Sequence, residues 1–400
     1  ALKAGRSAAG ASAASSHTGS LAGADKAADA LLKQSGVIRE FSLQDLFNTA
    51  KVFSHCPIPN GNRVAIVTNS GGPGIMATDA VCEHGMEIAH LSDQTKEALR
   101  SFLPAAASVK NPVDMIASAP LEHYKKTLET VLADDGVDMV VVIYLPFLGL
   151  KDIDVAKAVM EIRAAHPDKP IVGVFMTKNE FFAHLSETEV NVPFFMFAEQ
   201  AVEGLARLNQ QRLWRERTDT PAPRYSVDTE TVEAVFKQAA ADNRVQLTTG
   251  ESLQVLAAYG VRVCRDGEAK DADEAVALAN KIGYPVVMKL NSKEISHKTD
   301  VGGVRVGIKD ADQLRAEFAD LVNKLTEKGL MDGFEGVIIQ EMVKSDREMV
   351  CGCAKDPQYG QMMMFGLGGV FVEVMKDVTF RLAPLTVEDA SDMIHSVKAY

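Results

Sequence analysis

The sequence predicts an α/β protein in which a doubly wound parallel sheet precedes a second, largely antiparallel α+β region. In the first part, strand candidates such as residues 63–67, 138–146 and 170–176 alternate with helices, and they are apolar throughout. That combination is typical of a parallel sheet covered by helices on both faces. In the second part, several strand candidates follow one another across short turns, which indicates antiparallel pairing.

The composition fits such a protein and excludes several classes. The chain has 400 residues, enough for two or three domains, and 46% of them are hydrophobic and 24% charged. A net charge of -12 argues against a nucleic-acid partner. No apolar run approaches about 20 residues and no signal peptide is visible, so we expect a cytoplasmic protein without a membrane partner. The five scattered cysteines do not form a disulfide framework.

The first 55 residues mix small side chains with two predicted helices. Residues 24–32 have helical spacing and Gly36 follows as a stop, while Ser42 is a predicted N-cap for a helix over 43–53. The chain begins without methionine, and helical periodicity still runs at its last residues. We therefore expect a fragment at both ends.

The predicted parallel sheet begins with the strand 63–67, and Thr68 to Gly71 then turn the chain into a helix that starts at Gly72-Pro73. Helices are expected at 121–134 and 152–166, and a further strand at 192–197. The charged, proline-bearing stretch 214–230 contains the only tryptophan, Trp214, and is predicted to be exposed. After it we expect helices at 250–261 and 272–283 and strands at 284–290, 303–309, 336–343, 347–356, 362–367 and 370–378.

Two stretches near the N-terminus could handle phosphate. His17 stands in "SHTG" among small residues and could act as a base, a metal ligand or a nucleophile that carries phosphate. Taken alone, a histidine in a solvent loop is the simpler reading. The turn "TNSGGPG", residues 68–74, leads into a helix N-terminus whose free N–H groups suit an anion. A plain tight strand–helix connection is the alternative, and no lysine follows the glycines as in a Walker loop.

Two stretches of the later region could bind a nucleotide. Lys289 ends an apolar strand, where a bound phosphate would supply a partner for its ammonium group, and His297 follows in a polar segment before two glycines. A surface hairpin is the alternative. The strand end at Gln340, Glu341 and Val343 could present backbone groups to an adenine, although a plain core strand explains it equally well.

Two carboxylates are predicted on one apolar strand face. Glu373 and Asp377 are four residues apart, so they share that face with Phe371 and Met375. Buried carboxylates are costly unless they are paired or bind a cation, and Mg²⁺ shared with nucleotide phosphates would fit. Salt bridges to Lys376 or Arg381 are the alternative. A metal site at Cys351 and Cys353 is disfavoured because no second pair has zinc-ligand spacing.

In combination and in this order, the motifs resemble the NDP-forming acyl-CoA synthetases. The resemblance rests on "GRSAAGASAASSHTGSLAG", "VAIVTNSGGPGIMATDA", "NPVD", "GYPVVMKLNSKEISHKTDVGGV" and "FGLGGVFVEVMKD" and covers essentially the whole chain. The best-known members are ADP-forming acetate–CoA ligases, which are related to succinyl-CoA synthetase. The resemblance implies the C-terminal part of a succinyl-CoA-ligase-like domain at 1–56, a flavodoxin-like ligase domain at 57–213, a linker at 214–244 and an ATP-grasp domain at 245–400.

The resemblance also implies roles for individual residues. His17 matches the family's phosphorylated histidine, and His297 matches a second carrier histidine on a swinging loop. The implied phosphate-binding residues are Thr18, Gly19, Ser70, Gly71 and Gly72. The implied nucleotide-binding residues are Lys289, Gln340, Glu341, Val343 and Glu348. The implied Mg²⁺ ligands are Glu373 and Asp377.

The activity that the resemblance implies is the reversible conversion of acyl-CoA, ADP and phosphate into a carboxylic acid, ATP and CoA. Acyl phosphate and phosphohistidine would be intermediates, and ATP is favoured over GTP. The expected partners are a small carboxylic acid, CoA, ATP or ADP, phosphate, and further copies or subunits in a homo- or hetero-oligomer. The family's CoA-binding domain does not lie in these residues. The alternatives are a regulatory, effector-binding region of a protein lysine acetyltransferase and an ATP-grasp ligase for another acid.

Overall fold

The structure is a computed structural model that describes residues 1–7, 9–12, 25–147, 149–187, 189–218, 220–292, 301–345, 347–369 and 377–398. It divides into two compact units. The first unit, unit 1, consists of Ala1–Pro221 and Val350–Tyr400, and unit 2 consists of Ala222–Met349. Unit 1 therefore joins segments from both ends of the sequence.

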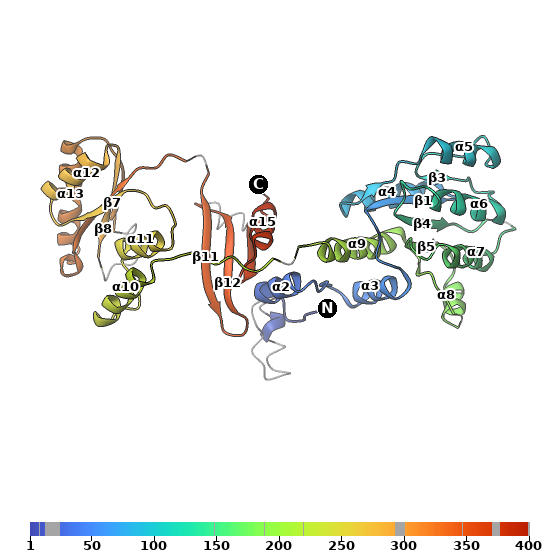
Figure 1. Cartoon of the computed structure of the whole chain (residues 1–400), viewed down its shortest axis with the longest axis horizontal. Helices are drawn as coiled ribbons and strands as arrows, with labels where there is room; N and C mark the ends of the chain where they lie inside the picture. Colours follow the sequence, from blue (N-terminus) through green and yellow to red (C-terminus); the bar gives the residue numbers. More distant parts are fainter. Residues whose placement is uncertain are drawn as a thin grey trace. The chain divides into compact units, whose positions relative to one another are not determined.

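In the part of the chain that the structure describes, unit 1 contains a six-stranded sheet in which every pair is parallel (Figure 1). Its order is β2-β1-β4-β5-β6, and β3 pairs with β1. With β3 set aside, this is the 2-1-3-4-5 order of flavodoxin-like proteins, so the predicted doubly wound sheet is confirmed. The strands are β1 (Arg63–Thr68), β2 (Glu87–Ile88), β3 (Val113–Asp114), β4 (Met139–Tyr144), β5 (Ile171–Phe175) and β6 (Phe194–Phe195).

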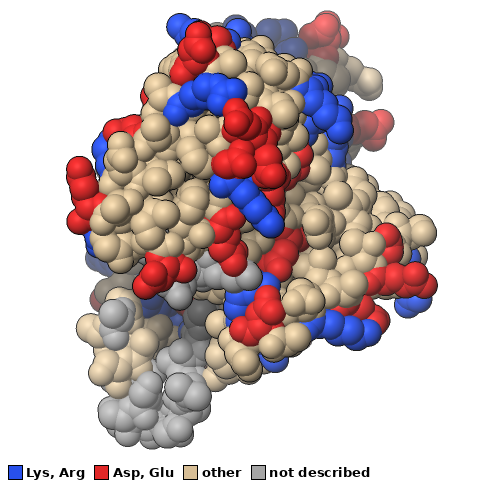
Figure 2. Space-filling model, turned by 90° about the vertical axis from the view of Figure 1, so that its left-hand side faces the viewer, with Lys and Arg blue, Asp and Glu red and all other residues tan. Residues whose placement is uncertain are grey.

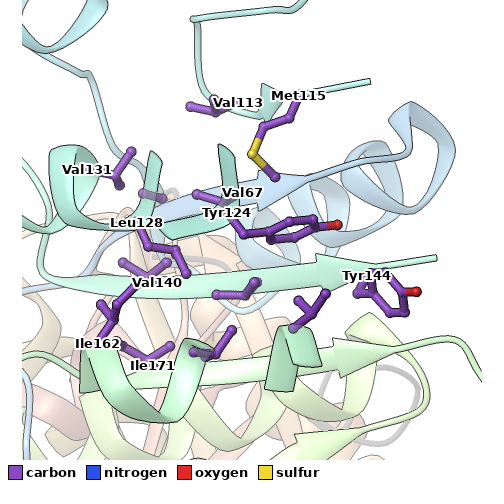
Figure 3. Packing of buried hydrophobic residues seen from close by; sticks show 14 of the residues in the cluster. Val67, Val113, Met115, Tyr124, Leu128, Val131, Val140, Tyr144, Ile162 and Ile171 are labelled. Atoms are coloured by element: carbon purple, nitrogen blue, oxygen red, sulfur yellow. The ribbon is translucent and has the colours of Figure 1, made fainter. Parts of the chain in front are cut away.

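Helices cover both faces of this sheet, which is why its strands are apolar on both sides. Along β1, Val64 and Ile66 belong to one buried cluster, while Ala65 and Val67 belong to the other. Figure 3 shows the second cluster, where Val67 and Val140 lie with Tyr124 and Leu128 of α6. The first cluster is covered by α3 (Leu43–His55), α4 (Gly71–Glu83) and α9 (Ala198–Arg215). The second is covered by α5 (Asp93–Phe102), α6 (Leu121–Leu132), α7 (Asp152–Ala165) and α8 (Asn179–Ser186).

Unit 1 also contains the three-stranded sheet β11-β12-β13. Helix α2 packs on β13, and the Nζ of Lys26 on this helix lies 4.5 Å from the centroid of the Phe380 ring. The strands are β11 (Met349–Asp356), β12 (Gly360–Leu367) and β13 (Val378–Leu382), and the helices are α2 (Asp25–Gln34) and α15 (Val387–His395). Helix α2 thus packs with residues more than 340 positions later in the sequence.

Unit 2 is built on an antiparallel sheet with the order β7-β10-β8-β9. Helices α12 and α13 cover one face, where alternate strand residues such as Val286, Met288 and Ile339 are buried. On the side of the chain that carries α12 and α13, acidic and basic side chains are interspersed (Figure 2). The elements are α10 (Thr229–Ala241), α11 (Thr249–Ala258), β7 (Asp266–Ala269), α12 (Ala272–Ile282), β8 (Val286–Asn291), β9 (Val304–Ile308), α13 (Ala311–Glu327), the 3-10 turn η1 (Met331–Gly333) and β10 (Gly336–Glu341).

Most predicted elements are confirmed, including the helix N-cap at Ser42, whose side chain accepts a hydrogen bond from the N–H of Asp45. The long helix α13 and the short strand β7 have no counterpart in the sequence prediction. Residues 229–241, within the predicted linker, form helix α10. The predicted strand at 370–378 falls mostly outside the described residues, and β13 begins at Val378. None of the described helices has the length and apolar character needed to span a bilayer.

Candidate phosphate and nucleotide sites

The first candidate site is the N-terminus of α4, at the carboxyl end of β1. Ser70 is the N-cap residue with extended backbone, and its side chain makes no capping hydrogen bond. The backbone N–H groups of Gly71 and Gly72 donate to no described residue, and both glycines are exposed. A Cβ on Gly72 would meet no atom within 4 Å. Ser70, Gly71 and Gly72 are therefore together at a helix end that offers open N–H groups and the positive end of the helix dipole.

The turn before α4 is held by side-chain hydrogen bonds that sequence reasoning did not single out. Asn69, which is 2% exposed, donates from Nδ2 to the Leu145 carbonyl (2.8 Å) and accepts the Leu145 N–H at Oδ1 (2.9 Å). Thr68 Oγ1 accepts the N–H of Ser70 (2.9 Å) and donates to its carbonyl (2.8 Å). These hydrogen bonds tie the turn to the end of β4 and hold the start of α4 in position.

Asp114, the last residue of the "NPVD" stretch, lies beside this helix end. It is the register partner of Thr68 in the β1–β3 pair, and its Oδ1 accepts the N–H of Ile116 (2.9 Å). Its Oδ2 would be 3.2 Å from a Cβ placed on Gly71. Asn111 of the same stretch lies inside the sheet, where it accepts the Ile66 N–H and donates to the carbonyls of Val64 and Ala89. The motif was visible in the sequence, but the contacts of Asp114 with Thr68 and Gly71, and those of Asn111, join residues that are distant in the chain.

The second candidate site is the face of the unit 2 sheet opposite α12 and α13. Lys289 on β8 donates from Nζ to Oε1 of Gln340 on β10 at 2.6 Å, so the structure brings these two predicted residues together. Asp266 on β7 is the register partner of Gln340. Burial raises the pKa of the Asp266 carboxyl, and the positive charge of Lys289 opposes this shift. Because Gln340 is neutral, a nucleotide phosphate would be a stronger partner for the Lys289 ammonium group.

The remaining predicted nucleotide-binding residues have different surroundings. Glu341 forms an ion pair with Arg265 at 3.1 Å, and hydrogen bonds from that guanidinium lower the pKa of the Glu341 carboxyl. Its side chain is thus engaged, while its backbone N–H donates to the carbonyl of Arg265. Val343 and Glu348 are exposed.

The predicted metal ligands are described in part. Asp377 is 8% exposed, and its Oδ1 accepts the backbone N–H of Lys398 at 3.0 Å. Within the described ranges, no group of three or more His, Cys, Asp or Glu side chains could hold a metal ion. Glu373 lies outside the described residues, as do the predicted carrier histidines His17 and His297 and the phosphate-binding Thr18 and Gly19.

Comparisons with known proteins cover the whole length of the chain. A family model described as a succinyl-CoA ligase like flavodoxin domain matches residues 1–53, a Ligase-CoA domain matches 64–202, and an ATP-grasp domain matches 238–400. A 4-hydroxybutyrate–CoA ligase [ADP-forming] from Nitrosopumilus maritimus is 36% identical over 99% of this chain and 57% of its own length. The acetate–CoA ligase [ADP-forming] I of Archaeoglobus fulgidus is 36% identical over 100% of this chain and 57% of its own length.

Two further relatives sharpen the assignment. The beta subunit of the acetate–CoA ligase [ADP-forming] I from Pyrococcus furiosus is 43% identical over 42% of this chain and 71% of that subunit. Among solved structures, the dinucleotide forming acetyl-coenzyme A synthetase 1 of Ca. Korarchaeum cryptofilum, in complex with phosphate and ADP, is 30% identical, with a TM-score of 0.50 over 54% of this chain and 47% of that one. The chain spans somewhat more than half the length of the first two ligases it matches. The chain belongs to the family of ADP-forming acyl-CoA ligases.

Proposed function

We propose that the protein carrying this chain is an acid–CoA ligase (ADP-forming) that moves a phosphoryl group between an acyl phosphate and ADP by way of histidine. The observation that carries the proposal is the presence, in one chain of this family, of an open helix N-terminus and a lysine-bearing sheet face. The first suits a phosphoryl group held by backbone N–H groups, and the second suits the phosphates of a nucleotide. The substrates would be a small carboxylic acid, CoA and ATP, or in reverse acyl-CoA, phosphate and ADP.

The proposed reaction has four reversible steps. Phosphate displaces CoA from the acyl group and gives acyl phosphate; the imidazole of His17 then takes the phosphoryl group and releases the carboxylate. His17 passes the phosphoryl group to His297, and ADP accepts it to form ATP. An imidazole nitrogen attacks phosphorus only when it is neutral, so we expect transfer to weaken below a pH of about 6.5. Each transfer depends mainly on position and on neutralisation of charge.

The scheme gives each predicted site residue a task, including those outside the described residues. The N–H groups of Gly71 and Gly72 would hold the phosphoryl group on its carrier, with Ser70, Thr18 and Gly19 around it. Lys289 would exchange its hydrogen bond to Gln340 for a nucleotide phosphate. The backbone of Gln340, Glu341 and Val343, with Glu348, would line the nucleotide. Mg²⁺ commonly binds through one or two carboxylates together with substrate phosphates, which fits Asp377 with Glu373.

The same proposal extends to the compartment and the oligomeric state of the protein. We propose that it works in the cytoplasm, as a homo- or hetero-oligomer joined through its ligase domains, with the domain boundaries predicted from the sequence. The relatives include ligases with separate alpha and beta subunits, which supports an assembly of several chains.

A labelling experiment on the full-length protein tests the proposal. With ATP labelled at its γ-phosphate and Mg²⁺, the protein should acquire an acid-labile, base-stable label that a carboxylic acid and CoA remove. His297→Ala should block labelling from ATP but still allow labelling from acyl phosphate. His17→Ala should block labelling from acyl phosphate.

The matched control is His84→Ala, because His84 is exposed and lies at the other end of α4. This variant should label as the unchanged protein does. Absence of any such label, or full labelling from acyl phosphate in His17→Ala, would contradict the proposal and would favour a region that binds an effector without catalysis.

A further inference from the structure

A pocket of about 450 Å³ lies in unit 1, apart from the residues of both candidate sites. Three segments line it: residues 33–38 at the end of α2, residues 210–217 at the end of α9, and residues 392–396 at the end of α15. These segments come from the start, the middle and the end of the sequence. The pocket therefore exists only because the tertiary structure brings them together.

Hydrogen bonds and ion pairs hold the walls of this pocket. The side-chain amide of Gln34 accepts the N–H of Leu382 (2.7 Å) and donates to its carbonyl (3.0 Å), so it pairs α2 with β13 as a neighbouring strand would. Arg217, just after α9, contacts two acids of α15: Asp389 at 3.0 Å and Asp392 at 3.6 Å. The charge of Arg217 is thus already balanced within the protein.

One wall of the pocket is aromatic. The six-membered ring of Trp214 lies so close to Gly36 that a Cβ there would be 2.3 Å from two ring carbons. Gly36 has a φ of +68°, which glycine adopts at little cost. Both the backbone conformation and the contact with the ring therefore require glycine at position 36. Trp214 is the only tryptophan among the 400 residues. Together with Val37, Ile38 and Leu213, this ring gives the pocket a planar, apolar part.

The pocket also presents a cation without a partner in the described chain. Lys33 forms no ion pair or hydrogen bond with another described residue. Partial burial and the nearby guanidinium of Arg381 both lower the pKa of Lys33. Arg381 is only 3% exposed, and its Nε and Nη2 have no hydrogen-bond partner among the described residues. The carboxylates of Asp392 and Asp29 raise the pKa of Lys33 and offset part of these effects, but the described ion pairs of these two acids are with Arg217 and Arg39. A bound anion would supply the direct partner that Lys33 lacks among the described residues.

We propose that this pocket binds a small organic anion that carries a carboxylate or phosphate group on a planar apolar body. The anionic group would pair with Lys33, and the planar body would pack beside Trp214. The amides of Gln210 and Gln211 line the same pocket and make no hydrogen bond to a described residue, so they can contact polar edges of that body. Such a ligand would touch α2, α9 and α15 at once. This inference goes beyond the proposed phosphoryl transfer, because none of these residues takes part in it.

The fluorescence of Trp214, measured as the difference between the full-length protein and its Trp214→Phe variant, provides the test. Benzoate and AMP are the probes, and they distinguish a carboxylate from a phosphate. Benzamide is the uncharged analogue of benzoate, and inorganic phosphate is an anion that lacks the planar apolar group. Titrations with AMP use the Lys289→Ala variant, so that the nucleotide face of unit 2 does not compete. Calorimetry repeats each titration, since AMP itself absorbs ultraviolet light.

We expect a saturable change with benzoate or AMP, and at least about tenfold weaker binding after Lys33→Ala, since a lost charged hydrogen bond has that effect. Benzamide should bind more weakly than benzoate. Lys26→Ala is the matched control, because Lys26 is on the same helix but contacts Phe380 instead of the pocket. The proposal is overturned if neither probe gives a saturable change, if Lys33→Ala binds as tightly as the unchanged protein, or if inorganic phosphate or benzamide matches the aromatic anions.

Discussion

The parallel sheet of unit 1 and the antiparallel sheet of unit 2 offer a phosphate two different kinds of partner. In the parallel sheet both faces are buried under helices, so a ligand can meet only the strand ends, where the N–H groups of Gly71 and Gly72 are open. In the antiparallel sheet the face under α12 and α13 carries the apolar cluster, and the other face carries Lys289, Gln340 and Asp266 beside the buried Ile338. The first site therefore uses backbone dipoles, and the second uses a side-chain charge.

The difference teaches how each site responds to mutation. A backbone N–H cannot be removed by truncating a side chain, and it depends on the turn that aims it. A side-chain ammonium can be removed by one substitution while the sheet stays intact. The backbone site should thus be sensitive to the surrounding fold, and the side-chain site to single residues.

The largest effect is expected for Lys289→Ala in unit 2. Loss of the ammonium group removes the charge that we propose to bind the nucleotide phosphates, so labelling of the protein from ATP should slow by at least about 100-fold. Labelling from acyl phosphate should change little, since it does not use the nucleotide face. Arg265→Ala is the control: it breaks the exposed ion pair with Glu341 and should leave the labelling rate within about twofold. If Lys289→Ala is labelled from ATP as fast as the unchanged protein, the side chain of Lys289 does not bind the nucleotide phosphates.

The next effect concerns the fold that supports the backbone site. Asn111→Ala leaves the N–H of Ile66 and the carbonyls of Val64 and Ala89 without their side-chain partner, which should lower the free energy of unfolding by about 3 kcal/mol. Urea denaturation followed by the fluorescence of Trp214 reports on unit 1. The exposed neighbour Lys110 supplies the control Lys110→Ala, with a change of less than about 0.5 kcal/mol. Similar denaturation midpoints for the two variants would show that Asn111 does not hold the sheet together.

A smaller effect is expected for Gly72→Ala at the backbone site itself. The structure has open space at this position, so the fold should be stable, but the added methyl group covers part of the surface where the phosphoryl group would lie. Labelling from acyl phosphate should slow by about tenfold, in keeping with a partly blocked set of N–H donors. Asp79→Ala, an exposed change in the same helix, should have no such effect. An unchanged rate for Gly72→Ala would argue that the phosphoryl group is held elsewhere.

The smallest effect concerns the acid stability of unit 2. Hydrogen bonds from Arg244 lower the pKa of Glu251 to about 2, below the value of about 4.3 for an unfolded chain. The pair therefore stabilises the fold above the unfolded pKa, and this contribution disappears as the pH falls from about 5 towards 2. Because the pair lies near the surface, we expect a loss of about 1 kcal/mol. Urea denaturation followed by circular dichroism at about pH 6 and pH 3 measures it.

The variant Glu251→Gln sharpens this last prediction. It cannot titrate, so its stability should fall less between the two pH values than that of the unchanged protein. An equal fall in both proteins would assign the acid sensitivity to other carboxyl groups of unit 2, such as Asp320, whose pKa is lowered by hydrogen bonds from Lys324 and Arg305.

Much of the fold could be predicted because its signals are local. The strands β1, β4 and β5 are short apolar runs, and the helix at Gly71 follows a glycine turn, so periodicity and turn chemistry were sufficient. Strand β7 was missed because its sequence, "DGEA", has no strand character, and only its pairing with β10 makes it a strand. Helix α13 was missed although its seventeen residues have a clear apolar spacing.

The sequence by itself determined the family, the α/β class and the residues proposed to carry phosphate, because motifs such as "SHTG" and "NSGG" are contiguous and need no tertiary contact to be seen. Only the tertiary structure decided that Glu341 forms an ion pair with Arg265 and that Asn69 and Asn111 hydrogen-bond within the parallel-sheet region. It also decided that Lys33 and Trp214 line one pocket. Each of these contacts joins positions that are distant in the chain. The physical reason is that a side chain's charge and hydrogen bonds depend on its neighbours in space, and periodicity along a sequence does not specify those neighbours.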